Sequence, residues 1–326
     1  MSESADILFH SMGSDVRVLV GSALLAGAED PHVAAWREQA YVEDFAARLS
    51  RFRSDSELTA LNRDPRAAVP ASPLLRSAVR AGLWAAQRSD GLVDPTLLSA
   101  IERAGYRASL DGCTPASLLE ALVAAPARRP ARAHPGAAWR QVQIDDRHGL
   151  VRRPPGVQID TGGTGKGLCA DAVAYRLRHY ERFVVDCGGD LAIGGVGAQL
   201  APYEVEIEHP LSGEVIRRVR VGAGGIATSG LNVRVWRDER GDFAHHLLDP
   251  ATGRPAWTGL IGVTALGLSA LEAETLSKMA LLRGPLGARR VLGEHGGLIV
   301  HDSGEVEQIG PLDAPHSVLR FSGSAA

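Results

Sequence analysis

The chain has 326 residues, of which 45% are hydrophobic and 22% charged, and its formal net charge at pH 7 is −3. This length is enough for one large domain or two, and the composition is that of an ordinary globular protein. A weakly negative chain without a long basic run is not expected to bind nucleic acid as its main partner.

The cysteines and the N-terminus give the expected location. Cys113, Cys169 and Cys187 are widely spaced, form neither a disulfide framework nor a paired zinc motif, and suit a reducing compartment. The acidic N-terminal segment lacks the basic and apolar regions of an export signal, and no apolar window has the length of a membrane span. We therefore expect a cytoplasmic protein without a membrane span.

Hydrophobic periodicity and capping signals place the elements of the first half. Ser54 and Glu57 have the spacing of a capping box, and the pairs Ser72-Pro73 and Thr114-Pro115 each put a capping residue before a proline suited to the first helical position. In chain order, the patterns predict a strand pair over 7–26 with a turn at 12–15, helices over 35–50, 54–61 and 72–89, a loop over 90–96, and a helix over 114–124.

Residues 126–138 are rich in proline, arginine and alanine and have no apolar period. We expect an exposed linker here, within a single domain that this segment could divide into two lobes.

Alternating patterns dominate the second half. In chain order, they predict strands over 142–144, 150–151, 157–159 and 183–187, strands over 203–208 and 215–221, a hairpin over 233–246, a buried strand over 260–268, a helix over 270–282, and a closing hairpin over 298–309.

A glycine-rich turn from Asp160 to Gly167 is placed between the strand at 157–159 and an amphipathic helix that begins near Leu168. Its glycines permit positive φ and a close approach of ligand to backbone, so that N–H groups can converge on an anion at the helix start. Lys166 adds a positive charge. The turn matches neither common phosphate-loop pattern, and plain chain reversal is the alternative.

A second strand ends in Gly188-Gly189-Asp190, about twenty residues beyond the first turn, with one helix between them. Two such turns could present backbone donors to one elongated ligand. A diphosphate between two ring systems suits that arrangement.

With these pieces in order, the chain resembles the ApbE family, the FAD:protein FMN transferases. The short motifs that carry the resemblance are Met12-Gly13, Ser56-Glu57-Leu58, Leu61-Asn62, Asp94-Pro95-Thr96, Asp160 to Asp171, Gly188-Gly189-Asp190, Thr228-Ser229-Gly230, and His246 to Pro250 with Gly253. The resemblance implies an α+β fold of antiparallel sheets and packed helices, and a bound FAD whose diphosphate lies near Lys166. Active members use magnesium to attach FMN through a phosphoester to a threonine or serine of an acceptor flavoprotein.

The resemblance also implies roles for single residues. The catalytic candidates are His246, which could accept the hydroxyl proton, and Lys166. The residues expected to bind FAD are Met12, Gly13, Asp94, Thr96, Gly162, Gly163, Lys166, Asp171, Gly188, Gly189, Asp190, Thr228, Ser229, Gly230, Arg234 and His246.

Plainer roles are the alternatives for several of these residues. His246 could cap a turn or pack locally, and His245 would face the opposite side of a strand. Asp171 could bond only to the turn backbone, which its position on the helix favours. Thr228 and Ser229 could belong to an ordinary hydrogen-bonded turn.

The expected metal site departs from the family pattern. Active relatives carry Ala-Asp-x-x-x-Thr on a late helix, with two oxygen ligands one turn apart and a backbone carbonyl from the glycine-lysine turn, here that of Gly165. In this chain Glu274 replaces the aspartate, and Lys278, which has no lone pair while charged, replaces the threonine. At this i, i+4 spacing we predict an ion pair in the space of the magnesium ion, with a solvated surface pair as the alternative.

Three functions remain open. The first is an FAD:protein FMN transferase, or an FAD pyrophosphatase, with an altered metal requirement. The second is a non-catalytic protein that binds or sequesters FAD. The third is a scaffold that has lost FAD binding and serves interaction.

Overall fold

The structure, a computed structural model, describes residues 4–24, 27 and 29–312. Its centre is a sheet in which every neighbouring pair of strands is antiparallel. From one edge to the other, the strands are β1 (Ala5–Ser11), β2 (Ser14–Val20), β6 (Phe183–Cys187), β7 (Asp190–Gly194), β10 (Gly224–Gly230), β15 (Leu260–Gly267), β16 (Gly297–His301) and β17 (Val306–Ile309).

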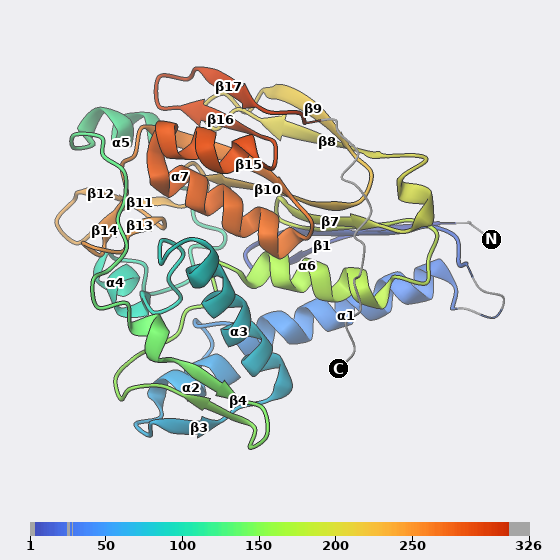
Figure 1. Ribbon diagram of the computed structural model, residues 1–326, viewed down its shortest axis with the longest axis horizontal. Coiled ribbons are helices and arrows are strands. Elements are labelled where there is room, and N and C mark those ends of the chain that lie inside the picture. Colours follow the sequence, from blue (N-terminus) through green and yellow to red (C-terminus); the bar gives the residue numbers. More distant parts are fainter. Residues whose placement is uncertain (1–3, 25–26, 28, 313–326) are drawn as a thin grey trace.

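Three long helices cover one face of this sheet, as Figure 1 shows. Helix α1 (Pro31–Leu49) lies over β1 and β2, α6 (Gly165–Arg176) over β6 and β7, and α7 (Ala270–Gly293) over β10 and β15. The hairpin of β8 (Tyr203–Glu208) and β9 (Val215–Val221) packs on the other face. The alternation of a strand explains this division, because Val184 joins the core beneath the hairpin and Val185 joins the core beneath the helices.

Most of the remaining elements surround one end of the sheet. They comprise α2 (Glu57–Arg63), α3 (Pro73–Arg88), α4 (Leu98–Arg103), α5 (Leu118–Ala124), a three-stranded sheet of β3 (Ala68–Pro70), β5 (Leu150–Arg152) and β4 (Gln143–Asp145), the hairpin of β11 (Val235–Arg237) and β12 (Phe243–His245), the pair β13 (Leu248–Asp249) and β14 (Arg254–Pro255), and a 3-10 turn at Ala138–Gln141. A second 3-10 turn, Val196–Ala198, lies at the other end, where the N–H of Gly197 donates to the Glu181 carbonyl. The predicted α+β fold of antiparallel sheets and packed helices is confirmed.

The sequence predicts the type of residue that caps these helices correctly, but its position less well. Ser72 caps α3 as expected, since its hydroxyl accepts the N–H of Leu75. The capping box was wrong: Ser56, not Ser54, accepts the N–H of Thr59 and caps α2. Helix α5 likewise begins later than predicted, after Ser117. More than one serine or threonine precedes α2 and α5, and the capping rule names the residue type without choosing among them.

The predicted strand at 157–159 does not form, and α6 begins at Gly165 rather than near Leu168. The backbone of Ile159 is bonded instead by the side chain of Asn62, which donates to the Ile159 carbonyl and accepts its N–H, both at 2.7 Å. A side-chain amide here replaces the neighbouring strand. Lys166 therefore lies in the first turn of a helix.

Helix α7 extends past its predicted end at 282. Gly284 adopts φ 68°, outside the helical range, and Pro285 follows it, so the helix changes direction there and continues to Gly293. A proline within a helix lacks the N–H for the usual bond and ends the first straight part.

Residues 126–138 run over the surface, with Ala131 and Ala137 buried. Backbone bonds attach this segment to the body, from Arg129 N–H to the Trp257 carbonyl and from Ala131 N–H to the Leu282 carbonyl. The division into one or two lobes stays a prediction.

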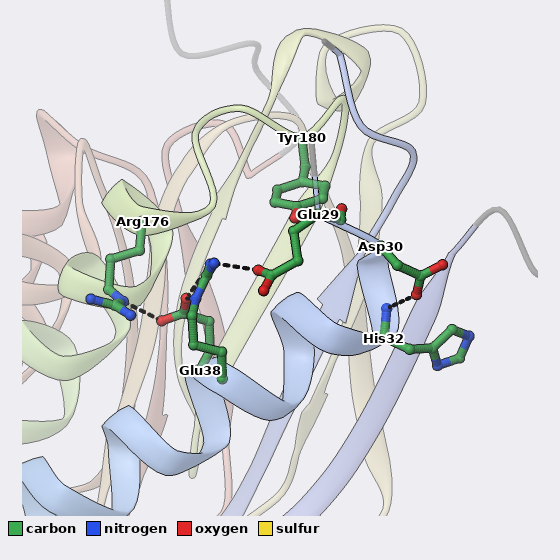
Figure 2. A network of polar contacts seen from close by, with 7 residues as sticks. Glu29, Asp30, His32, Glu38, Arg176 and Tyr180 are labelled. Atoms are coloured by element: carbon green, nitrogen blue, oxygen red, sulfur yellow. Dashed lines mark hydrogen bonds and ion pairs between the residues drawn. The ribbon is translucent and has the colours of Figure 1, made fainter. Parts of the chain in front are cut away.

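A buried carboxylate joins α1 to α6 (Figure 2). Glu38 on α1 is fully buried and pairs with Arg37 at 2.7 Å and with Arg176 of α6. Tyr180 donates its hydroxyl proton to the Glu29 carbonyl at 3.0 Å. These bonds fix α6, whose first turn carries Lys166. In the described part of the chain, no helix combines the length and the apolar character needed to cross a bilayer.

Candidate active site

A pocket of about 830 Å³ opens where the end of α1, the start of α6 and the middle of α7 meet the turn between β1 and β2. Its walls come from segments far apart in the sequence. The sequence-predicted residues on these walls are Met12, Gly13, Asp94, Gly162, Gly163, Gly165, Lys166, Arg234, His246 and Lys278.

Met12 and Gly13 form the two-residue turn that joins β1 to β2. Their φ values are 55° and 66°, and Ser11 pairs with Ser14 on either side of them. Positive φ at both positions is the geometry of the tight hairpin turns that match strand twist. The turn brings Met12 to the rim of the pocket.

Lys166 connects the two glycine turns. Its ammonium group donates to the Gly188 carbonyl at 3.0 Å and lies 2.7 Å from Oδ2 of Asp190, a residue only 1% exposed. Burial alone would lower the pKa of Lys166, but Asp190 and Glu274 outweigh it and leave the pKa raised. Lys166 is therefore a charged ammonium at the pocket wall.

The glycine turn itself already uses part of its amides. The N–H of Gly162 donates to Asp160 and that of Gly167 to Oε2 of Glu274 at 2.9 Å. The turn therefore depends on Lys166, more than on a full ring of amides, for its positive charge.

Lys278 and Glu274 form the ion pair that their spacing predicts. The distance from Nζ to Oε1 is 2.8 Å, Glu274 is fully buried, and the Lys278 side chain is 12% exposed. The alternative of a solvated surface pair is wrong. Burial raises the pKa of Glu274, while Lys278 acts in the opposite direction.

His246 lies on the pocket wall with its Nδ1 atom buried and without a hydrogen-bond partner among the described residues. Burial, followed by the charges of Arg234, His245, Lys278 and Lys166, holds the pKa of His246 well below its usual value of 6.5. The imidazole is therefore neutral at pH 7 and can accept a proton.

His245 faces away from His246, as expected for adjacent residues at the end of a strand. It is fully buried, with its ring edge against Trp257 at 4.6 Å between centroids. Burial lowers the pKa of His245 to about 3. It belongs to the core.

Arg234 completes the positive wall. The Nη2 atom would lie 3.9 Å from a Cβ placed on Gly13, so the guanidinium reaches across to the β1–β2 turn. In the described ranges, Arg234 has no carboxylate partner within ion-pair distance. An unpaired guanidinium, two ammonium groups and a neutral histidine thus meet at one pocket.

Other predicted contacts lie behind this wall. Asp171 accepts the N–H groups of Ala270 and Leu271 at 2.8 and 3.0 Å and so caps α7, and burial raises its pKa. Asp171, which lies within α6, thus contacts the start of α7 and does not line the pocket. The predicted residues that do not line the pocket are Thr96, Asp171, Gly188, Gly189, Asp190, Thr228, Ser229, Gly230 and Glu274.

The last three residues of the central strand β10 are Thr228, Ser229 and Gly230, so this motif is part of a strand and does not form a loop. The Thr228 hydroxyl lies 2.8 Å from that of Thr264, and the Ser229 hydroxyl lies 2.7 Å from that of Ser277 on α7. The N–H of Thr228 donates to the Gly189 carbonyl. Thr96 donates its hydroxyl proton to Asp94, whose pKa burial raises.

An arginine between aromatic rings was not among the residues predicted from the sequence. Arg51 lies 4.2 Å from the ring centroid of Phe52 and 4.4 Å from that of Tyr106, and its Nη1 donates to the Tyr106 carbonyl. Its Nη2 is buried without a partner, and all three residues line the pocket. An arginine followed by a phenylalanine was the only sequence signal, and Tyr106 is remote in the chain.

A pocket of this size, walled by an unpaired guanidinium and two carboxylate-paired ammonium groups beside a neutral histidine, suits an anionic ligand next to a proton acceptor. The chain belongs to the ApbE family, whose pattern matches residues 12–300. It is 30% identical over 260 residues to the FAD:protein FMN transferase of Salmonella typhimurium, covering 76% of this chain and 70% of the relative. It is 25% identical to the protein of that name from Haemophilus influenzae, covering 80% and 75%.

Solved structures agree with this assignment. The ApbE protein of Thermotoga maritima superimposes with a TM-score of 0.74 at 25% identity, covering 94% of this chain and 97% of that one. The flavin transferase ApbE of Vibrio cholerae gives 0.73 at 20% identity, covering 95% and 98%, and shows the shared fold.

Proposed function

We propose that this protein is an FAD:protein FMN transferase. The observation that carries the proposal is the neutral His246, with an unpartnered Nδ1, beside the cations Lys166, Lys278 and Arg234 in one pocket. Family membership and the names of the relatives support it. The pocket volume lies within the range of sites for ligands of drug size.

The step divides into three tasks. The acceptor hydroxyl oxygen bonds to the phosphorus of the FMN half, the bond from that phosphorus to the bridging oxygen breaks, and AMP leaves with that oxygen. His246 takes the hydroxyl proton. Lys166, Lys278 and Arg234 offset the negative charge of the diphosphate as it develops. The serine or threonine belongs to an acceptor flavoprotein.

The proposal includes an altered metal site. The family implies magnesium held in part by a threonine oxygen, but in this chain Lys278 stands at that position. Both oxygens of Glu274 already accept hydrogen bonds, from Lys278 and from Gly167. The residues present do not fit a divalent cation, so each task of the transfer falls to the side chains of the pocket.

A cytoplasmic location belongs to the same proposal. It rests on the cysteines, because Cys113, Cys169 and Cys187 are all free thiols.

A non-catalytic FAD-binding or FAD-sequestering protein is the second candidate, and an FAD pyrophosphatase is a variant of the first. The lysine at position 278 favours the non-catalytic candidate, because an ammonium group offers no open coordination position. One experiment separates all three. The protein is incubated with FAD, with and without a flavoprotein domain that carries an acceptor threonine, and AMP release and the mass of the acceptor are followed.

AMP release together with FMN on the acceptor supports the transferase. AMP release without acceptor modification indicates a pyrophosphatase. FAD binding without AMP release indicates a binding protein, and the absence of FAD binding overturns the whole proposal.

A further inference from the structure

The chain uses lysine at two positions only, and both lie at this site. Of its 35 basic residues other than histidine, 33 are arginine, and the two lysines are Lys166 and Lys278. An ammonium is a compact, strongly charged point, whereas a guanidinium is a flat fork. Lysine thus occurs only at the two positions where its ammonium group pairs with a buried carboxylate.

The two lysines belong to one cluster of four charges. Lys278 pairs with the fully buried Glu274 of α7 at 2.8 Å, and Lys166 pairs with the almost fully buried Asp190 of β7 at 2.7 Å. The N–H of Gly167, the residue after Lys166, donates to the same Glu274. Two cations therefore balance two carboxylates that water cannot reach.

Oxygen atoms for a divalent cation are scarce in this cluster. Glu274 spends one oxygen on Lys278 and the other on Gly167, and Asp190 has Oδ2 beside Lys166. Both Asp190 oxygens are buried without a hydrogen-bond partner among the described residues, and of the two Oδ2 lies in ion-pair contact with Lys166. Magnesium is held in proteins by one or two carboxylates and completes its octahedron with water or phosphate oxygens, and both carboxylates of this cluster are paired with lysine.

We propose that the ammonium of Lys278 is the resident cation of the site, which neutralises a diphosphate in the pocket and excludes a divalent metal. The diphosphate part rests on the proposed function. Lys278 lines the pocket while its Nζ remains bonded to Glu274, so its charge is presented to a ligand without leaving the buried carboxylate.

Removal of the ammonium should have the reciprocal effect. Its loss leaves Glu274 as a buried carboxylate without its cation, which is strongly unfavourable. A threonine at that position removes the positive charge and adds an oxygen one helical turn from the carboxylate. Lys278→Thr should therefore convert a metal-indifferent protein into one that is stabilised by metal.

The first test compares melting temperatures in EDTA and in millimolar Mg²⁺ or Mn²⁺, without flavin. For Lys278→Thr we expect a melting temperature about 5 to 10 °C lower in EDTA and at least half of that loss recovered with metal. The parent protein should not respond. Arg289→Thr is the matched control, because it removes the same charge from the same helix but from a partly exposed pair with Glu307, and it should not respond either. A metal-stabilised parent protein, or a folded Lys278→Thr that ignores metal, overturns the proposal.

The second test uses the parent protein alone and stands even if the variant does not fold. With lysine as the only ¹⁵N-labelled residue type, the spectrum contains side-chain signals from two ammonium groups, which Lys278→Arg assigns. ADP added in EDTA should shift the Lys278 signal, and Mg²⁺ added alone should leave it in place. A shift with Mg²⁺ alone, or none with ADP, contradicts the proposal. Neither test involves an acceptor or turnover, so a protein that transfers FMN only with magnesium would fail here and still keep its proposed function.

Discussion

The Nζ atom of Lys166 lies 2.7 Å from Oδ2 of Asp190, at the junction between the first turn of α6 and the start of β7. The same ammonium donates to the Gly188 carbonyl. One side chain thus connects two glycine turns that the helix α6 separates in the chain. It gives the pocket wall a positive charge and balances a buried carboxylate at once.

This double role predicts two separable effects of Lys166→Met. Unfolding free energy should fall by about 3 to 5 kcal/mol, because Asp190 is left buried and uncompensated. FAD affinity should fall roughly 10- to 150-fold, the effect of losing a charged contact of about 1.5 to 3 kcal/mol. Denaturant unfolding and calorimetry measure the two quantities. Adding Asp190→Asn should recover much of the stability and little of the affinity, and a folded Lys166→Met with unchanged FAD affinity would remove this residue from the binding site.

His246→Ala should leave FAD binding largely unchanged and abolish transfer. The imidazole acts on the proton of the acceptor, and a general base contributes about 10² to 10⁴-fold in rate. Binding is measured by flavin fluorescence and transfer by the mass of the acceptor. Transfer at the parental rate in this variant would show that His246 only shapes the pocket wall.

The sequence predicted those parts of the site that are local in the chain. The Glu274–Lys278 pair follows from i, i+4 spacing on one helix, and strand alternation predicts a turn at 12–15, which in the structure is only Met12-Gly13. Contacts between distant segments could not be predicted in this way. Arg51 and Tyr106 are 55 residues apart and meet only in the folded chain.

Errors in the secondary structure have similar causes. The strand β7 was missed because Asp190–Gly194 is short and lies between glycines, and its five residues are buried on both faces without alternation. The apolar pattern at 157–159 predicts a strand, because that pattern is the same whether a neighbouring strand or the side chain of Asn62 satisfies the backbone. The central strand β10 contains glycines because the start of α7 approaches it closely: a Cβ on Gly225 would lie 2.2 Å from the Ser269 carbonyl oxygen.

Acid should destabilise the protein through His245. Its pKa is about 3 in the folded chain and near 6.5 when unfolded. Between these values the unfolded state binds the extra proton, so stability rises with pH and falls on acidification, by at most about 1.4 kcal/mol per pH unit. His245→Phe keeps a ring against Trp257 and removes this proton. Urea unfolding from pH 6.5 to 4.5 should show a shallower loss in the variant, and parallel curves would mean that His245 does not titrate on unfolding as described.

Gly167→Ala should be destabilising, because helices α6 and α7 touch at this glycine. A Cβ there would lie 2.7 Å from the Ala270 carbonyl oxygen and 2.8 Å from the Leu271 Cα. Both are backbone atoms of the start of α7, and such overpacking costs about 1 to 3 kcal/mol. Gly165→Ala is the matched control two residues earlier, since nothing lies within 4 Å of its Cβ. Urea unfolding should separate the two variants, and equal stability would indicate that the helices can move apart at little cost.

Exchange of the resident cation for oxygen ligands should change the metal requirement of the site. In Glu274→Asp with Lys278→Thr, the ammonium is gone and two oxygen ligands stand one helical turn apart, beside the unpartnered Oδ1 of Asp190. FAD cleavage, followed as AMP release, should then depend on Mg²⁺ and stop in EDTA. The single variant Glu274→Asp keeps Lys278 and should show no such dependence, because a buried ammonium repels a second cation nearby. The double variant could instead bind FAD and cleave it equally with Mg²⁺ and with EDTA. That result would show that Lys278 is not the reason why this site differs from a metal-dependent one. A parent protein that already requires Mg²⁺ for cleavage would show that Lys278 moves aside when ligand binds.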